Sequence, residues 1–341
     1  MREHSLQATL ARPIHACGVG LHSGRRSAVT LHPASVDSGV NFRILSGDGP
    51  RLVAGTYLNR VPGRMNTALR VDDRRKLRTV EHLLAALRGM EIDNAVVEVS
   101  GEELPILDGS ARPWCDLIAE AGRSIQPERR RLIAITAPFQ IRHGGSFIRA
   151  EPCPDLVVDI TTDQLPSFGV LRWCGTLDRR AFYEEVAPSR SFGTADSVLR
   201  THLKHSVFTR FLGRARQDRL LTALAASRIC REREHAANRP LAGCPGALDP
   251  ALLPSLPDDP ADPLLRGARP TRAAFIVGRY TLGGARFADE PVRHKVVDML
   301  GDLSLAGHAF LGRFVAHVPT HALTYAFLAM LMRSDAWELR R

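Results

Sequence analysis

Residues 292–303 carry the pattern that most constrains how this chain can fold. Apolar side chains recur there at the spacing of one face of an α-helix: Val292, Val296, Met299, Leu300 and Leu303. The opposite face presents His294, Asp298 and Asp302 at successive steps of four residues, with Lys295 beside them. The segment therefore predicts a helix that buries one stripe and aligns ionisable groups on its other side.

A shorter helical pattern occupies residues 80–87. Its apolar stripe consists of Val80, Leu83, Leu84 and Leu87. Thr79 stands where the helix N-cap is expected, because its hydroxyl can accept a hydrogen bond from a backbone N–H of the first turn. Glu81 and His82 then fall in that first turn, off the apolar stripe and at the exposed end of the helix.

Short β-rich runs surround these helices in both halves of the chain. Five runs are expected to form strands: Ser27–Leu31, Val40–Ile44, Ala95–Val99, Leu132–Thr136 and Leu156–Ile160. Further helices are expected near Trp114–Ala121 and Ala322–Met332. The mixture of strands and helices predicts an α+β protein.

The length of 341 residues suits roughly two domains. Pro127 and the charged run Glu128–Arg131 interrupt the pattern of strands and helices. We therefore place the boundary there, which gives an N-terminal domain of residues 1–126 and a C-terminal domain of residues 127–341.

An insertion is expected in the second domain at about residues 201–265. Its first half, Arg210–Arg233, is basic and rich in alanine and leucine, which is typical of a helix. Its second half, Pro240–Pro263, is rich in proline, which lacks the backbone N–H that helices and central strands need. This half is expected to be an exposed, mobile loop, whereas Arg210–Arg233 is expected to pack near the substrate entrance.

The charge balance limits the class of partner. The chain holds 46 Lys and Arg against 36 Asp and Glu, a net charge of +10. This favours an anionic partner, which can be a nucleic acid, a lipid surface or a phosphate-bearing small molecule. The N-terminus lacks an apolar run of signal-peptide length, and no apolar stretch approaches the ~20 residues that span a bilayer. We therefore expect a cytoplasmic protein.

Side chains from the two helical patterns can together hold one metal ion. His294 and Asp298 emerge one turn apart from the same helical face, and His82 supplies a third ligand. Such a set leaves one tetrahedral position open, as in catalytic zinc sites, although the same ligands also suit iron. Glu81 is then placed to act as a general base. The proton donor stays open among several histidines, including His15, His22, His308 and His321.

Both patterns also have a plainer interpretation. Glu81 can simply complement the helix dipole while His82 lies on the surface. The polar face with His294, Asp298 and Asp302 can be a solvated face whose charges stabilise the helix.

Five segments together distinguish these alternatives. In chain order they read HACGVGLHSG, TVEHLLAALRGMEIDNAVVEV, ELPILDGSARPW, SRSFG and VRHKVVDMLGDLSLAGH. They resemble the UDP-3-O-acyl-N-acetylglucosamine deacetylase family, zinc amidohydrolases of the committed step of lipid A biosynthesis in Gram-negative bacteria. The matches cover the first ~125 residues almost continuously and the last ~70.

The resemblance implies two domains of similar topology, each a layer of helices packed on a β-sheet, with the active site between them. It implies Zn²⁺ as the cofactor and His82, His294 and Asp298 as its ligands. The remaining roles that it implies are Glu81 as general base, His321 as the acid that protonates the amine leaving group, Asp302 as the residue that orients His321, Lys295 near the oxyanion or the diphosphate, Ser191 bound to the tetrahedral intermediate, and Phe192 against the sugar.

Three segments depart from the family pattern. The family has Ser-Gly-His where this chain has Pro319-Thr320-His321, and it has Gly-Gly-Ser where this chain has Gly267-Ala268-Arg269. The acyl-chain passage is expected after Asp159, where the usual Asp-Phe-x-His-Pro reads Asp-Ile-Thr-Thr-Asp up to Asp163. The zinc and acid–base positions are unchanged.

The leading hypothesis is therefore hydrolysis of the acetamide of UDP-3-O-acyl-N-acetylglucosamine, with no nucleic acid as partner. We expect a monomer, and a transient contact with the inner-membrane surface would suit the acylated substrate and basic clusters such as Arg74–Arg78. One alternative is a divergent zinc amidohydrolase that acts on another amide. The other is a basic RNA-binding α+β protein, with Arg129–Arg131 and Arg210–Arg233 as its footprint.

Overall fold

The computed structural model describes residues 6–45, 49–63, 65–194, 265–269, 271–277, 280–281 and 283–341. The predicted insertion at 201–265 lies outside these residues except for Leu265. The expected helix Arg210–Arg233 and the expected loop Pro240–Pro263 are therefore not described.

Two larger sheets dominate the fold. The first has the order β2-β3-β9-β4-β5 and is formed by β2 (Ile14–Val19), β3 (Arg26–Pro33), β4 (Val40–Ile44), β5 (Arg51–Ala54) and β9 (Ala95–Val99). The second has the order β12-β13-β19-β11-β20, with β14 paired to β19 and β15 paired to β14. Its strands are β11 (Leu132–Ile135), β12 (Phe139–His143), β13 (Ser146–Glu151), β14 (Leu156–Thr162), β15 (Leu171–Thr176), β19 (Ala309–His317) and β20 (Trp337–Arg340).

The same topology occurs twice in these sheets. In the first, the hairpins β2-β3 and β4-β5 flank β9, which is antiparallel to β3 and parallel to β4. In the second, the hairpins β12-β13 and β14-β15 flank β19 with the same polarity. The flanked strand follows a helix each time, α1 (Glu81–Gly89) or α6 (Glu290–Ser304), and precedes another, α2 (Arg112–Ala121) or α7 (His321–Leu331). The predicted α+β class is confirmed.

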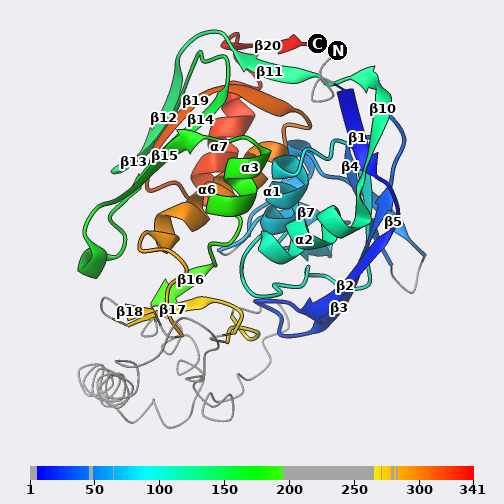
Figure 1. Cartoon of the computed structure of the whole chain (residues 1–341), viewed down its shortest axis with the longest axis horizontal. Coiled ribbons are helices and arrows are strands. Elements are labelled where there is room, and N and C mark those ends of the chain that lie inside the picture. Colours follow the sequence, from blue (N-terminus) through cyan, green and yellow to red (C-terminus); the bar gives the residue numbers. More distant parts are fainter. Residues whose placement is uncertain are drawn as a thin grey trace.

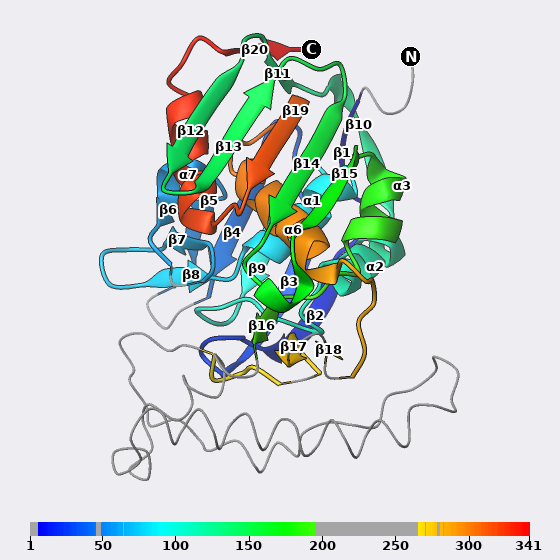
Figure 2. The same ribbon diagram turned by 90° about the vertical axis from the view of Figure 1, so that its left-hand side faces the viewer.

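The helices lie between the two sheets. Figure 1 shows α6 and α7 against the second sheet and α1 and α2 against the first, so that the layers run sheet, helices, helices, sheet. Figure 2 looks onto the second sheet, with α6 and α7 behind it. One hydrophobic core joins the layers, since it includes Leu83 and Leu87 of α1 together with Val296 and Leu300 of α6.

Smaller elements close the edges. Three small sheets pair β1 (Leu6–Leu10) with β10 (Arg123–Arg129), β6 (Arg60–Val61) and β8 (Lys76–Arg78) with β7 (Ala68–Arg70), and β16 (Phe192–Thr194) and β18 (Tyr280–Thr281) with β17 (Ala274–Val277). The short helical turns are η2 (Tyr57–Asn59), η3 (Pro166–Phe168), α3 (Arg179–Ala181) and η4 (Phe182–Val186). The predicted boundary between residues 126 and 127 falls inside β10, and the division there stays a prediction.

The predicted cap of the first helix is wrong. Helix α1 begins at Glu81, and no side chain caps its first turn. Thr79 instead has a left-handed backbone, with φ of 59°, and its hydroxyl donates to Glu103 Oε1 at 2.9 Å. The same carboxylate accepts from the backbone N–H groups of His22 and Ser23. The Thr79 hydroxyl therefore bonds to the buried Glu103 carboxylate and does not cap the helix.

Among the described residues, no helix is long and apolar enough to cross a membrane. Helix α6 spans 15 residues, and its side facing α1 carries charged groups.

Candidate active site

The three predicted metal ligands meet where α1 packs against α6. Their candidate ligand atoms all lie within 4.8 Å of one another. His294 Nε2 is 3.3 Å from Asp298 Oδ1, and His82 Nε2 is 3.7 Å from the same oxygen. His82 stands at the start of α1, whereas His294 and Asp298 are one turn apart on α6. The fold therefore brings together residues that are more than 200 positions apart in the chain.

These donors fit a divalent metal. The Nδ1 of His294 lies 3.0 Å from the carbonyl oxygen of Ser189, which can only accept, so Nδ1 carries the proton and Nε2 presents a lone pair. Desolvation alone would raise the pKa of Asp298, but His294 and His82 together hold it well below its usual range. An ionised aspartate and a neutral imidazole are the forms that bind a metal.

Glu81 lies beside the ligand cluster and is buried. One carboxylate oxygen accepts from the backbone N–H of Thr67 at 3.0 Å, and the other is 3.9 Å from His321 Nε2. Burial raises the pKa of Glu81 to about 7, although His321 and His82 oppose the shift. A carboxyl group with a pKa near neutrality can take up and release a proton at physiological pH.

The sequence placed Glu81 and His82 at an exposed helix end, and this expectation is wrong. Glu81 is 3% exposed and His82 is 4% exposed. The reason is the close approach of α6, because a side chain at Gly301 would lie 2.1 Å from the Glu81 carbonyl oxygen. The solvated-face interpretation fails in the same way for His294 and Asp302, both 3% exposed.

His321 reaches the site from the first turn of α7. Its Nδ1 is 2.8 Å from Asp302 Oδ2. Burial on its own would lower the pKa of His321, but Asp302 and the neighbouring carboxylates outweigh that effect and raise the pKa to about 10. Of the histidines that the sequence left open, His321 is the one in contact with Glu81 and Asp302, while His15 pairs with Thr30 and His308 lies beside Arg88.

Thr67 is a member of the site that the sequence did not indicate. Its hydroxyl donates to Asp302 Oδ1 at 2.5 Å, while its backbone N–H donates to Glu81. Thr67 therefore ties Glu81 to the partner of His321. It lies in the segment before β7 with no helical or strand periodicity around it, so no pattern could mark it.

Of the remaining predicted residues, Lys295 lies on α6, and Ser191 directly precedes β16, which begins at Phe192. Lys295 is 8% exposed, and its Nζ donates to the Pro319 carbonyl at 3.1 Å. Burial lowers the pKa of Lys295, and Asp298 opposes the shift. The Phe192 ring lies 6.3 Å from the His294 ring and 5.9 Å from Lys295 Nζ. Ser191 is held by its backbone, which donates to Gly109 O at 2.6 Å and accepts from Ala274 N at 2.7 Å.

The structure describes residues in each of the three segments that depart from the family pattern, and each has defined contacts. Thr320 caps α7 by accepting from Leu323 N at 3.2 Å, which sets His321 at the start of the helix. Gly267 packs so closely on the first half that a side chain there would lie 2.0 Å from the Gly20 carbonyl oxygen. Asp159 lies in β14 and binds Arg172 and Arg313 rather than the ligand cluster.

Two histidines and an aspartate around one point, with a buried glutamate and a histidine–aspartate pair beside them, are typical of metal-dependent hydrolases. The family model of UDP-3-O-acyl N-acetylglycosamine deacetylase matches residues 7–208 and 261–333, and the chain belongs to this family.

Similar curated proteins carry the same name. The UDP-3-O-acyl-N-acetylglucosamine deacetylase of Methylococcus capsulatus is 31% identical over 98% of this chain and 92% of its own length. That of Acidithiobacillus ferrooxidans is 33% identical over 97% of this chain and 92% of its length. That of Neisseria meningitidis is 30% identical over 97% and 91%.

Proposed function

We propose that this protein hydrolyses the N-acetyl group of UDP-3-O-acyl-N-acetylglucosamine, which releases acetate and UDP-3-O-acyl-glucosamine in the committed step of lipid A biosynthesis. One observation carries the proposal: His82, His294 and Asp298 converge beside Glu81 and His321 in a member of this family. Hydrolysis of an amide needs a base for the attacking water and an acid for the departing amine, and the site offers both.

We assign the metal position to His82, His294 and Asp298, and the metal to Zn²⁺. When bound, Zn²⁺ supplies Lewis-acid chemistry that polarises a carbonyl group and acidifies water. The Ser189 carbonyl keeps His294 in the tautomer that offers Nε2. The donor set also suits iron, so the identity of the metal belongs to the proposal.

Glu81 and His321 carry the protons. Glu81, in its ionised form, takes a proton from the attacking water. His321, held protonated by Asp302 at 2.8 Å, gives a proton to the departing amine. Glu81 Oε1 lies 3.9 Å from His321 Nε2, so the proposed base and the proposed acid are close neighbours beside the ligand cluster. Thr67 fixes the spacing between them through its hydrogen bonds to Glu81 and Asp302.

Lys295 and Ser191 are assigned to the substrate's oxygen atoms. Lys295 follows the ligand His294 on α6, and its buried ammonium group is assigned to the negative charge that develops on the amide oxygen or to the diphosphate. Phe192 provides an apolar surface for the sugar. The Ser191 hydroxyl is assigned to the tetrahedral intermediate, and the rigid backbone bonds of Ser191 support this role.

The RNA-binding alternative is not favoured. Within its proposed footprint, Arg130 pairs with Asp93 at 2.9 Å and Arg131 pairs with Asp37 at 3.2 Å, so these two arginines have partners within the chain, while Arg210–Arg233 lies outside the described residues. We retain as proposals the cytoplasmic location, the monomeric state and a transient contact with the inner-membrane surface, which the acyl chain of the substrate would favour.

Substitution of single ligands tests the assignment. His82→Ala, His294→Ala and Asp298→Ala should each lose bound zinc and the release of acetate, because each removes one of three protein ligands. Asp159→Asn serves as the control for zinc content alone, since Asp159 binds Arg172 and Arg313 rather than the ligand cluster. Stoichiometric zinc in all three variants contradicts the ligand set. Bound zinc without acetate release from the wild-type protein contradicts the substrate and leaves a divergent amidohydrolase.

A further inference from the structure

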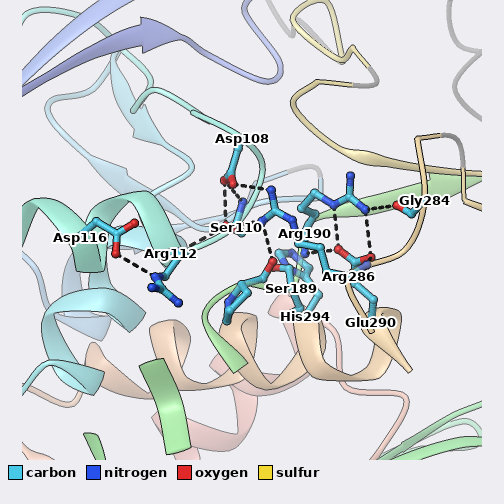
Figure 3. Close-up of polar contacts among 11 residues, drawn as sticks. Asp108, Ser110, Arg112, Asp116, Ser189, Arg190, Gly284, Arg286, Glu290 and His294 are labelled. Atoms are coloured by element: carbon cyan, nitrogen blue, oxygen red, sulfur yellow. Dashed lines mark hydrogen bonds and ion pairs between the residues drawn. The ribbon is translucent and has the colours of Figure 1, made fainter. Parts of the chain in front are cut away.

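A chain of charges with alternating sign runs from the first half of the molecule to the helix that carries His294 (Figure 3). Arg286 Nη2 donates to Asp108 Oδ2 at 2.7 Å, and the backbone N–H of Arg286 donates to Glu290 Oε2 at 2.9 Å. Arg190 completes the chain on the other side of Glu290, with Nε to Oε1 at 2.8 Å and Nη2 to Oε2 at 3.1 Å. None of these four residues takes part in the proton transfers assigned above.

The pair of Arg190 and Glu290 is the buried part of this chain. Glu290 is 1% exposed and Arg190 is 8% exposed. The Glu290 carboxylate also accepts from the backbone N–H of Arg190 at 3.0 Å, and Arg190 donates to the Gly284 carbonyl at 2.6 Å. Burial alone would raise the pKa of Glu290, but Arg190 and the backbone N–H groups of Arg286 and Arg190 lower it.

Such a pair is a poor source of stability, because the desolvation of two charges consumes most of their attraction. What a fully bonded buried pair provides is a fixed geometry. Here it joins two segments that are 100 positions apart in the chain, the residues around Arg190 and the first turn of α6.

Both segments determine the position of His294. Glu290 precedes His294 by one turn on α6. On the other side, Ser189 is the neighbour of Arg190, and its carbonyl oxygen is the partner of His294 Nδ1 at 3.0 Å (Figure 3). The next residues along the chain are Ser191 and Phe192, and the Phe192 ring lies 6.3 Å from the His294 ring. The Arg190–Glu290 pair thus joins the first turn of α6, the helix that carries His294, to the segment whose Ser189 carbonyl is hydrogen-bonded to the His294 ring.

We propose that Arg190 and Glu290 are positioning residues of the metal site, which hold the Ser189 carbonyl against His294 and thereby keep Nε2 directed at the metal position. They act through the partner of a metal ligand, and such outer contacts typically contribute a factor of ~10 to 100 in metal affinity. The inference rests on the proposed metal site, but not on the identity of the substrate.

The test compares Glu290→Gln with Asp159→Asn in the full-length, zinc-loaded protein. Both substitutions replace a buried carboxylate, bound by arginine, with an amide of nearly the same shape. Asp159 is 5% exposed, accepts from Arg172 at 2.9 Å and from Arg313 at 2.8 Å, and lies in β14. The measurements are the dissociation constant for Zn²⁺, by competition with a chelator, and the melting temperature.

Glu290→Gln should weaken Zn²⁺ binding ~10- to 100-fold, whereas Asp159→Asn should change it less than about twofold. With zinc at saturation, Glu290→Gln should lower kcat more than it raises KM. Equal Zn²⁺ affinity in the two variants, with a similar loss of melting temperature, overturns the proposal and leaves a purely structural ion pair.

Arg190→Lys provides a second variant if Glu290→Gln does not fold. It keeps the charge but loses the forked contact with Glu290, so it should also weaken Zn²⁺ binding. Unchanged Zn²⁺ affinity in this variant likewise contradicts the proposal. A wild-type protein that binds zinc but does not release acetate would refute the proposed substrate, while the comparison of Zn²⁺ affinities would still decide the role of the pair.

Discussion

Glu81 and His321 face each other with pKa values displaced in the same direction for different reasons. Burial raises the pKa of Glu81 to about 7, whereas Asp302 raises the pKa of His321 to about 10 against the effect of burial. The proposed mechanism needs Glu81 ionised and His321 protonated. The rate should therefore rise as the pH passes about 7 and fall as it passes about 10.

Single substitutions separate the two limbs of this profile. Glu81→Gln should remove the acidic limb and lower kcat ~10²-fold or more while zinc stays bound. Asp302→Asn should move the alkaline limb to lower pH, because it removes the largest contribution that raises the pKa of His321. The profile of kcat against pH measures both effects. An alkaline limb that does not move in Asp302→Asn contradicts the assignment of His321 as the acid.

Residues that serve the site only through hydrogen bonds to its ionisable groups could not be predicted from the sequence. The ionisable residues of the site could be named from the sequence because their types and spacing imply chemistry. Thr67 and Ser189 could not, since one contributes a hydroxyl and a backbone N–H and the other a backbone carbonyl. Backbone groups occur at every residue, so no sequence pattern distinguishes these two.

At the scale of elements, the close packing of α1 and α6 decides the geometry of the site. Gly301 permits this contact, because a Cβ there would lie 2.1 Å from the Glu81 carbonyl oxygen, which is backbone and cannot turn aside. Gly301→Ala should therefore separate the helices, lower the melting temperature and reduce zinc affinity. In a helix without such a contact, alanine would instead stabilise by ~1 kcal/mol.

Gly145→Ala is the control for this substitution, because no atom lies within 4 Å of a Cβ at Gly145. Its melting temperature and zinc content should match the wild type. A Gly301→Ala protein as stable as wild type, with full zinc content, contradicts the role of the close contact.

The helices themselves were predictable, but the packing of their polar faces was not. The stripe at residues 292–303 gave a helix close to the observed Glu290–Ser304. Helical periodicity tells which residues share a face, but not whether water or another helix covers it. Periodicity therefore left a solvent-exposed polar face open as an alternative to the metal site, whereas His294 and Asp302 are buried.

At the scale of the whole molecule, two copies of one topology place their corresponding helices α1 and α6 back to back between the sheets (Figure 1). No repeat of sequence identity announces this arrangement, because the two copies share an order of strands and helices rather than residues. The family resemblance implied it, whereas composition and periodicity alone predicted no more than an α+β chain. The metal position then lies where the two copies meet, with one ligand from α1 and two from α6.

The central claim is that this meeting point binds zinc for the hydrolysis of an acetamide. The most direct measurement is the release of acetate from UDP-3-O-acyl-N-acetylglucosamine by the purified protein, with its metal content determined before chelation, after chelation and after return of zinc. We predict about one zinc per chain, loss of acetate release on chelation, and recovery when zinc returns. Acetate release that persists in metal-free protein, or no release at full zinc occupancy, would contradict the account.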